Sequence, residues 1–121
     1  MTPEEPSLLA SVAEILDDMK AVDPAFLDLR SLTAMTDFFV IAHGTNERQV
    51  RATAEEVERR IKQSRGVLPK HVEGLKAAQW ILMDYGDLVV HLFQEGQRRR
   101  YGLETIWTDA PRVDPATTDT D

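Results

Sequence analysis

The sequence predicts an α+β or α/β domain, a mixed β-sheet with flanking helices in the order α-β-β-α-β-β-β-α. Three patterns indicate this fold class. Apolar residues recur at helical spacing in two stretches, residues 37–42 form a continuous apolar run after one Asp, and residues 79–93 form two apolar runs around a turn. The 121 residues are enough for one domain with a single core.

The first part of the chain predicts one helix and two strands. Ser7 is a suitable N-cap for a helix whose apolar positions continue to Met19. Asp23-Pro24 is expected to end this helix, because the residue before proline is disfavoured in the α conformation. Phe26 to Leu29 predicts a short strand, and Asp37 to Ala42 predicts a central strand buried on both faces.

A second helix is expected after the turn His43-Gly44-Thr45-Asn46. Asn46 and Gln49 have capping-box spacing, an apolar stripe runs from Val50 to Ile61, and Gly66 is expected at C′. Charge pairs at i,i+4 in the favourable order support the helix: Glu47–Arg51, Glu55–Arg59 and Glu58–Lys62.

The C-terminal half predicts a short strand over Pro69 to Leu75, the hairpin, and a last helix over Gln97 to Trp107. Residues 1–6 are expected to be a flexible N-terminus and residues 7–110 the domain. Residues 111–121 are rich in Pro, Thr and Asp and are expected to form a disordered tail.

The hairpin sorts its side chains onto two faces. With Tyr85-Gly86 as a two-residue loop, Trp80 faces His91 and Asp84 faces Asp87. One face is then apolar and suits a core: Ile81, Met83, Leu88, Val90 and Leu92. The other mixes an aromatic with polar groups, as a recognition surface does: Trp80, Leu82, Asp84, Asp87, Val89 and His91. A three-residue bulged loop would shift the register by one and mix these sets.

Composition limits the partners. The formal net charge of −7 disfavours non-specific binding to DNA and favours a basic protein partner, a class that includes ribosomal proteins. The chain has no cysteine, which excludes disulfides and thiolate zinc sites and fits a reducing, cytoplasmic location. There is no apolar run near the roughly 20 residues of a membrane helix, and the N-terminus does not resemble a signal peptide.

Candidate sites for small ligands each have a simpler structural explanation. Asp84 and Asp87 are able to bind a divalent cation or to stabilise the turn, and the second role is favoured. Gly44-Thr45-Asn46 is able to receive a phosphate or to form a turn and cap, and again the second is favoured. His43, His71 and His91 lack metal-pair spacing, and His91 is equally suited to an interface or to a half-buried strand.

Two further features stay open at this point. Trp80 is the better aromatic for recognition, whereas Trp107 is expected in the core. Arg98-Arg99-Arg100 is either a solvated helix face or a contact to ribosomal RNA. No catalytic triad or nucleophile elbow can be assembled, so no catalytic residue, cofactor or metal is expected.

Several segments, in this order and spacing, resemble the ribosomal silencing factor family (RsfS, or Iojap-like) over roughly residues 7 to 111. The resemblance implies a five-stranded mixed sheet similar to that of nucleotidyltransferases. Active members of that superfamily carry Gly-Ser and strand carboxylates, whereas Gly44 precedes Thr45 here and no Asp-x-Asp follows, so the resemblance implies no enzyme activity. The segments are Asp37–Ala42, Glu47–Ala52, Val72–Gly74, Ala78–Phe93 and Tyr101–Trp107.

The resemblance also implies a function. The family is understood to bind the large ribosomal subunit through large-subunit ribosomal protein fourteen, to block association with the small subunit, and so to repress translation under nutrient limitation or in stationary phase. The implied partner-binding residues are Trp80, Leu82, Asp84, Tyr85, Asp87, Val89 and His91, with Tyr101 and Glu104 from the last helix. The alternatives are a nucleotide-binding or nucleotidyl-transferring enzyme of the same fold and a protein that self-associates as a homodimer.

Overall fold

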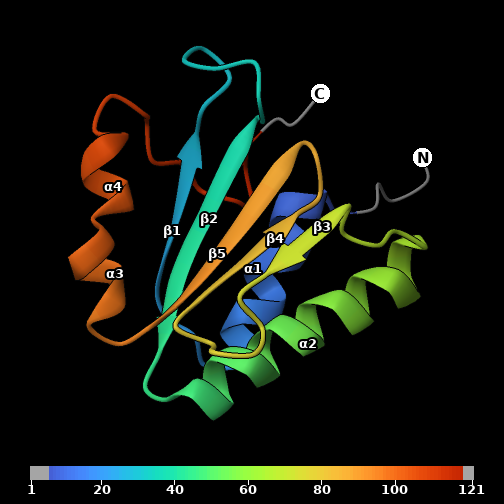
Figure 1. The fold of residues 1–121 in the computed structure, drawn as a ribbon. Coiled ribbons are helices and arrows are strands. Elements are labelled where there is room, and N and C mark those ends of the chain that lie inside the picture. Colours follow the sequence, from blue (N-terminus) through green and yellow to red (C-terminus); the bar gives the residue numbers. More distant parts are fainter. Residues whose placement is uncertain (1–5, 119–121) are drawn as a thin grey trace.

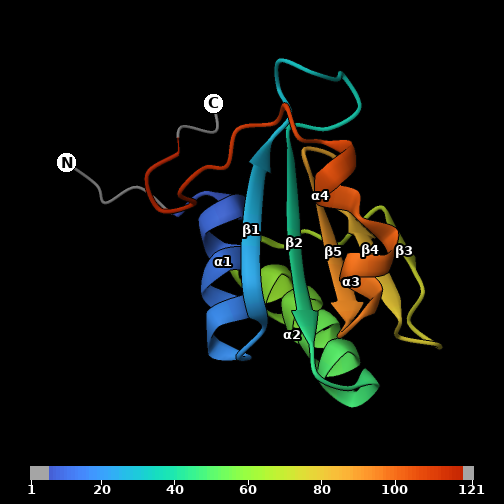
Figure 2. The ribbon, with the colours of Figure 1, turned by 90° about the vertical axis from the view of Figure 1, so that its left-hand side faces the viewer.

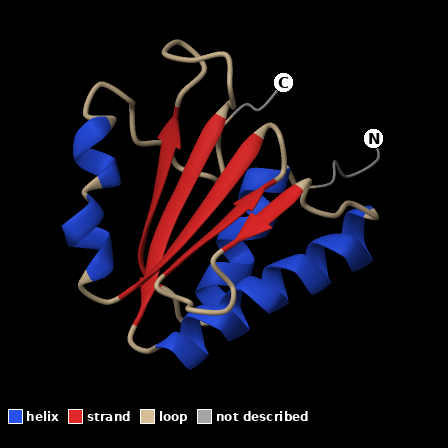
Figure 3. Cartoon of the chain, viewed as in Figure 1, coloured by secondary structure: helices blue, strands red, loops and turns tan. Residues whose placement is uncertain are grey.

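The computed structural model describes residues 6–118 and contains one five-stranded sheet with helices on both faces (Figures 1 and 3). The strands are β1 (Val22–Asp28), β2 (Phe38–Gly44), β3 (His71–Glu73), β4 (Trp80–Asp84) and β5 (Leu88–Gln94). The helices are α1 (Leu8–Asp18), α2 (Glu47–Arg65), α3 (Gln97–Tyr101) and α4 (Leu103–Ile106).

The sheet is mixed, as the sequence predicted. Its strand order is β1-β2-β5-β4-β3, in which β2 and β5 are parallel and every other neighbouring pair is antiparallel. The parallel pair requires a crossover, and α2 with the β3–β4 segment supplies it. The predicted fold class is therefore confirmed.

The two faces of the sheet have different covers (Figure 2). Helices α1 and α2 pack on one face, and their apolar stripes meet strand residues in the main core. Helices α3 and α4 cover part of the opposite face, where a smaller core contains Leu27, Ile41 and Phe93. Since α3 and α4 are short, this second face is only partly covered.

Several local predictions are confirmed. Ser7 caps α1 by accepting a hydrogen bond from the Ala10 amide, and Asn46 caps α2 by accepting one from the Gln49 amide at 2.9 Å. Gly66 ends α2 in the left-handed conformation, at φ +68°. The Glu55–Arg59 pair is replaced by an i,i+3 ion pair between Arg59 and Glu56 at 2.6 Å.

The end of α1 and the start of β1 differ from the prediction. The helix ends at Asp18, before Asp23-Pro24, and Lys20 turns the chain with φ +60°. Asp23-Pro24 instead lies inside β1, where Asp23 has φ +52° and the register with β2 shifts. A bulge accommodates proline on this edge strand because the missing N–H faces no partner strand there.

The hairpin has the predicted loop length but a different register. Tyr85 N–H donates to the Leu88 carbonyl at 2.8 Å, so Gly86-Asp87 is the two-residue loop. Gly86, at φ +91°, occupies the first loop position, where a type II′ turn prefers glycine. Trp80 therefore opposes Phe93 rather than His91, and Asp84 opposes Val89 rather than Asp87.

This shift amounts to two residues, so the strand side chains keep their predicted faces. Ile81, Met83, Leu88, Val90 and Leu92 all lie in the core under α1 and α2. Because side chains alternate with a period of two, an even shift preserves the faces and only an odd one would exchange them.

The C-terminal region also differs from the prediction. The expected single helix over Gln97 to Trp107 is divided at Gly102, which adopts φ +58°. Beyond it, Val113 N–H donates to the Phe26 carbonyl and Asp28 N–H to the Pro111 carbonyl, each at 2.9 Å. Residues 111–113 thus pair with β1, where the sequence predicted a disordered tail; residues 1–5 and 119–121 lie outside the described range.

Candidate functional site

A row of aromatic side chains crosses the partly covered face of the sheet. Trp80 on β4 stacks on Phe93 of β5, with ring centroids 5.1 Å apart, and Tyr101 of α3 lies 4.8 Å from the Trp80 ring. On the other side, Trp80 Nε1–H donates to His91 Nδ1 at 3.1 Å. The hairpin therefore brings Trp80 and His91 together although they are not directly opposite.

The row continues toward β2. The Phe39 ring meets His91 edge-on at 4.5 Å and Trp107 edge-on at 5.8 Å. We call this surface, together with the half-buried strand residues beside it, the aromatic face. Its members are Phe39, Trp80, Leu82, Asp84, Val89, His91, Phe93, Tyr101 and Trp107.

The part of the aromatic face that α3 and α4 leave open contains a pocket of about 170 Å³. Its floor comes from the sheet and its wall from the loop between β1 and β2. The lining residues are Thr33, Met35, Thr36, Phe39, Leu82, Asp84, Val89, His91 and Trp107. The lining residue Met35 is 87% exposed, and Ile106, which precedes the lining residue Trp107 in the chain, is 70% exposed. Large apolar side chains of both segments therefore face solvent.

Most of the predicted site residues meet on this face. Trp80, Leu82, Asp84 and Val89 are half-buried there, and Tyr101 is 47% exposed beside Trp80. His91 is buried, and burial lowers its pKa to about 4, so its imidazole is neutral near pH 7.

Three of the predicted site residues, Tyr85, Asp87 and Glu104, do not lie on this face. Tyr85 packs in the main core under α1 and α2, and burial raises its pKa to about 12. The loop lies one residue later than predicted, which makes Tyr85 a strand-end residue pointing to the core. Asp87 is exposed in the hairpin loop rather than on the strand surface.

Glu104 lies in an ion-pair network that fastens α3 and α4. Arg98 Nε donates to Glu104 at 2.8 Å, and Arg112 also pairs with Glu104 at 2.8 Å. Arg98 Nη1 additionally donates to the Asp23 carbonyl at 2.6 Å on β1. The Arg98 hydrogen bond holds the Glu104 pKa below its usual value, and the arrangement assigns Glu104 a structural role.

At the two candidate ligand sites that the sequence indicated, the polar groups make hydrogen bonds within the chain instead. Asp84 Oδ1 accepts from the Gly86 amide at 2.7 Å, as expected of a turn-forming Asp. At the β2–α2 junction, the Thr45 amide and hydroxyl both donate to Gln49 Oε1. Within residues 6–118, no group of three or more His, Cys, Asp or Glu is placed to hold a metal ion.

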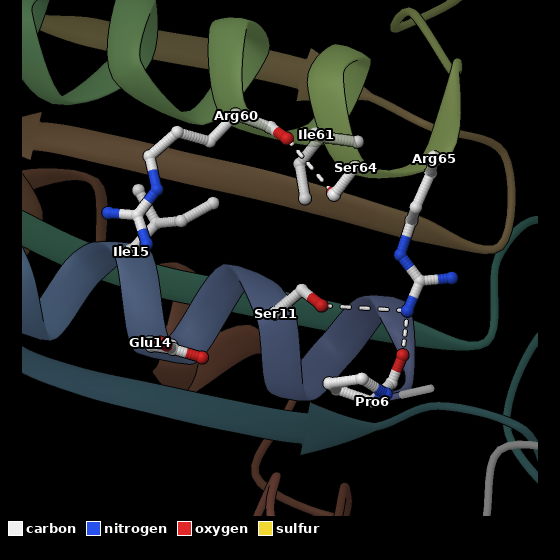
Figure 4. A pocket seen from close by; sticks show the side chains of 8 residues that line it. All are labelled: Pro6, Ser11, Glu14, Ile15, Arg60, Ile61, Ser64 and Arg65. Atoms are coloured by element: carbon white, nitrogen blue, oxygen red, sulfur yellow. Dashed lines mark hydrogen bonds between the residues drawn. The ribbon is translucent and has the colours of Figure 1, made fainter. Parts of the chain in front are cut away.

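A second hollow, of about 310 Å³, lies between α1 and α2 on the opposite side of the sheet (Figure 4). Its arginines are engaged in contacts within the chain. Arg60 pairs with Asp18 at 2.8 Å, and Arg65 donates to the Pro6 carbonyl and approaches the Ser11 hydroxyl at 3.5 Å. These contacts join α1 to α2 and give the hollow a structural explanation.

Comparison with known proteins identifies the family. A protein-family sequence model described as "Ribosomal silencing factor during starvation" matches residues 2–121. The chain belongs to this ribosomal silencing factor family. It is 40% identical over 107 residues to ribosomal silencing factor RsfS of Halalkalibacterium halodurans, covering 88% of this chain and 91% of that protein. It is also 39% identical over 108 residues to RsfS of Bacillus subtilis, and this match covers 89% of this chain and 91% of that protein.

The fold agrees with this assignment. A crystal structure of a protein from Chromobacterium violaceum superposes with a TM-score of 0.80 at 30% identity, covering 97% of this chain and 96% of that one. The names of the curated RsfS relatives describe a regulatory protein rather than an enzyme. None of the helices in residues 6–118 has the length and apolarity needed to cross a membrane.

In this member of the family, the sequence patterns did not predict the loop that forms the wall of the pocket. Met35 and Thr36 lie between two predicted strands, in a stretch without helical or strand periodicity. Phe39 was assigned to a central strand buried on both faces, yet it is half-buried and lines the pocket. Leu32 and Met35, two large apolar residues in this stretch without periodicity, were the available signal, and the structure leaves both exposed, as at an interaction site.

Proposed function

We propose that this protein binds the large ribosomal subunit through large-subunit ribosomal protein fourteen, using the aromatic face. Occupying that position blocks association with the small subunit and represses translation under nutrient limitation or in stationary phase. The protein then acts in the cytoplasm, by steric exclusion, and needs neither a cofactor nor a metal.

The main observation behind this proposal is that α3 and α4 cover the aromatic face only in part. Trp and Tyr are enriched among residues that dominate binding energy, and Trp80 and Tyr101 lie side by side there. Met35, in the pocket lining, and Ile106, on α4, add further exposed apolar side chains. A specific interface needs about 800 Å² per partner, which a face of one small domain can supply.

Charge supports the choice of partner. The chain carries 21 acidic and 14 basic residues, for a formal net charge of −7. An acidic protein is attracted to a basic ribosomal protein and repelled by bare RNA. Asp84 lines the pocket and Asp87 is exposed in the adjacent loop, so acidic groups border the apolar surface.

Sedimentation with purified ribosomal subunits tests the proposal. The protein should sediment with isolated large subunits and not with small subunits, and preincubation should reduce the joined-ribosome peak in a sucrose gradient. A protein that stays in the supernatant with large subunits at low salt would contradict the proposal. Heat of binding on titration with nucleoside triphosphates and magnesium would instead favour a nucleotide-binding enzyme.

We further propose that any homodimer of the free protein forms through the aromatic face, because the same exposed apolar groups are available to a second copy. Light scattering should then show the dimer dissociating when ribosomal protein fourteen is added. A dimer that persists in the complex would place self-association on another surface.

A further inference from the structure

Two buried polar atoms near the pocket on the aromatic face have no hydrogen-bond partner within residues 6–118. They are His91 Nε2 and Thr36 Oγ1. Both residues line the pocket, and their side chains are well buried, His91 at 3% exposure and Thr36 at 6%. Buried polar groups are nearly always paired in folded proteins, so two unpaired ones beside one cavity call for an explanation.

The hydrogen bond from Trp80 fixes what His91 offers to the pocket. Because Trp80 Nε1–H can only donate, His91 Nδ1 must be the acceptor, and a neutral imidazole then carries its proton on Nε2. The unpaired atom is therefore an N–H donor. The Thr36 hydroxyl is also able to donate, so both groups suit a hydrogen-bond acceptor.

The surroundings indicate a neutral acceptor. The imidazole carries no positive charge near pH 7, and the Asp84 carboxylate lines the same pocket, so an anionic group would be repelled. Phe39, Leu82, Val89 and Trp107 make the remaining lining mostly apolar. A carbonyl oxygen carried next to an apolar group satisfies both the donors and the lining.

We propose that this pocket receives a carbonyl oxygen of the ribosomal partner, bound by His91 Nε2–H and the Thr36 hydroxyl. The inference rests on the proposed function and identifies the contact that would set its specificity. Both polar atoms are shielded from solvent, so the carbonyl enters only when lining side chains move aside. Met35, a lining residue with 87% exposure, is able to change rotamer without loss of core contacts.

Two substitutions at His91 distinguish the roles of its two ring nitrogens. His91→Asn places an amide oxygen near the Nδ1 position and keeps an acceptor for Trp80, but it does not reach the Nε2 position. His91→Gln extends an amide N–H to the Nε2 position. Sedimentation with isolated large subunits should show about tenfold weaker binding for His91→Asn, equal to about 1.4 kcal/mol, and near wild-type binding for His91→Gln.

Thr36→Val is a matched test at the second donor, because it removes the hydroxyl with little change in volume. Its binding should weaken several-fold while the free protein keeps its stability or gains some. Wild-type affinity for both His91→Asn and Thr36→Val would overturn the inference. Failure of the wild-type protein itself to bind would contradict the proposed function instead.

A measurement on the wild-type protein does not depend on the folding of any variant. Nitrogen-15 NMR of the imidazole should show the Nε2–H tautomer of His91 in the free protein. Addition of isolated ribosomal protein fourteen should then shift the Nε2 and Hε2 signals, as a new hydrogen bond requires. Binding that leaves both signals unchanged would overturn the inference.

Discussion

Trp80 and His91 lie on neighbouring strands and orient each other. The indole N–H satisfies one imidazole nitrogen at 3.1 Å, and Phe39 packs edge-on against the same ring. Each side chain is thereby held in one rotamer, which lowers the entropy cost of presenting a binding surface. At the residue scale, the site is a set of packed aromatic rings in which Trp80 Nε1–H is a hydrogen-bond donor and His91 Nδ1 its acceptor.

The burial of His91 predicts a pH dependence of folding. Its pKa falls from 6.5 to about 4 in the folded protein, so between these values the unfolded chain binds a proton that the folded chain does not. Stability present above about pH 6.5 should decline as pH falls toward 4, by about 3 kcal/mol at most. Urea unfolding measured across this window checks the prediction.

The control for this effect is His91→Asn, which does not titrate. Its stability should change less with pH over the same window, while the contribution of His43, whose pKa is also lowered by burial, remains in both proteins. Equal slopes for the wild-type protein and the variant would show that His91 is not the titrating group.

At the scale of elements, the position of α3 and α4 on the sheet depends on one arginine, Arg98. They are only five and four residues long, too short to be stable alone. Arg98 connects them to β1 through the Val22 and Asp23 carbonyls and to each other through Glu104. These helices carry Tyr101 and precede Trp107, so Arg98 acts on the aromatic face indirectly.

Arg98→Ala should therefore destabilise the protein by about 1–3 kcal/mol, because several charge-assisted hydrogen bonds are lost together. It should also increase hydrogen exchange in α3 and α4 and weaken binding to large subunits. Arg99→Ala is the matched control, since Arg99 is exposed on the same helix, and its effect on stability should stay within about 0.5 kcal/mol. Equal effects in urea unfolding would contradict the connecting role of Arg98.

At the scale of the whole molecule, local patterns predicted the elements well. Periodicity and capping located α1, α2 and the strands, and alternation assigned the hairpin side chains to the correct faces. The hairpin register was wrong by two because both turns keep that alternation, and only the backbone preference of Gly86 distinguishes them. This difference moved Tyr85 from the predicted surface into the core.

The parts of the site that were missed depend on tertiary contacts. The pairing of residues 111–113 with β1 arises from contacts distant in sequence, whereas the last helix is divided locally, at Gly102 with φ +58°. The pocket wall at Met35 and Thr36 forms only because the β1–β2 loop folds over the sheet. Such arrangements leave little local pattern for sequence reasoning to use.

The most direct test of the account compares the same substitution on two surfaces. Leu82 is half-buried on the aromatic face, whereas Leu68 is 53% exposed in the segment after α2. Light scattering should follow the joining of purified ribosomal subunits in the presence of each protein. Leu68→Asp should inhibit joining as the wild-type protein does, and Leu82→Asp should need at least about tenfold more protein, because a charge is placed in an apolar contact. Equal inhibition by Leu82→Asp and the wild-type protein would contradict the assignment of the aromatic face as the ribosome-binding surface.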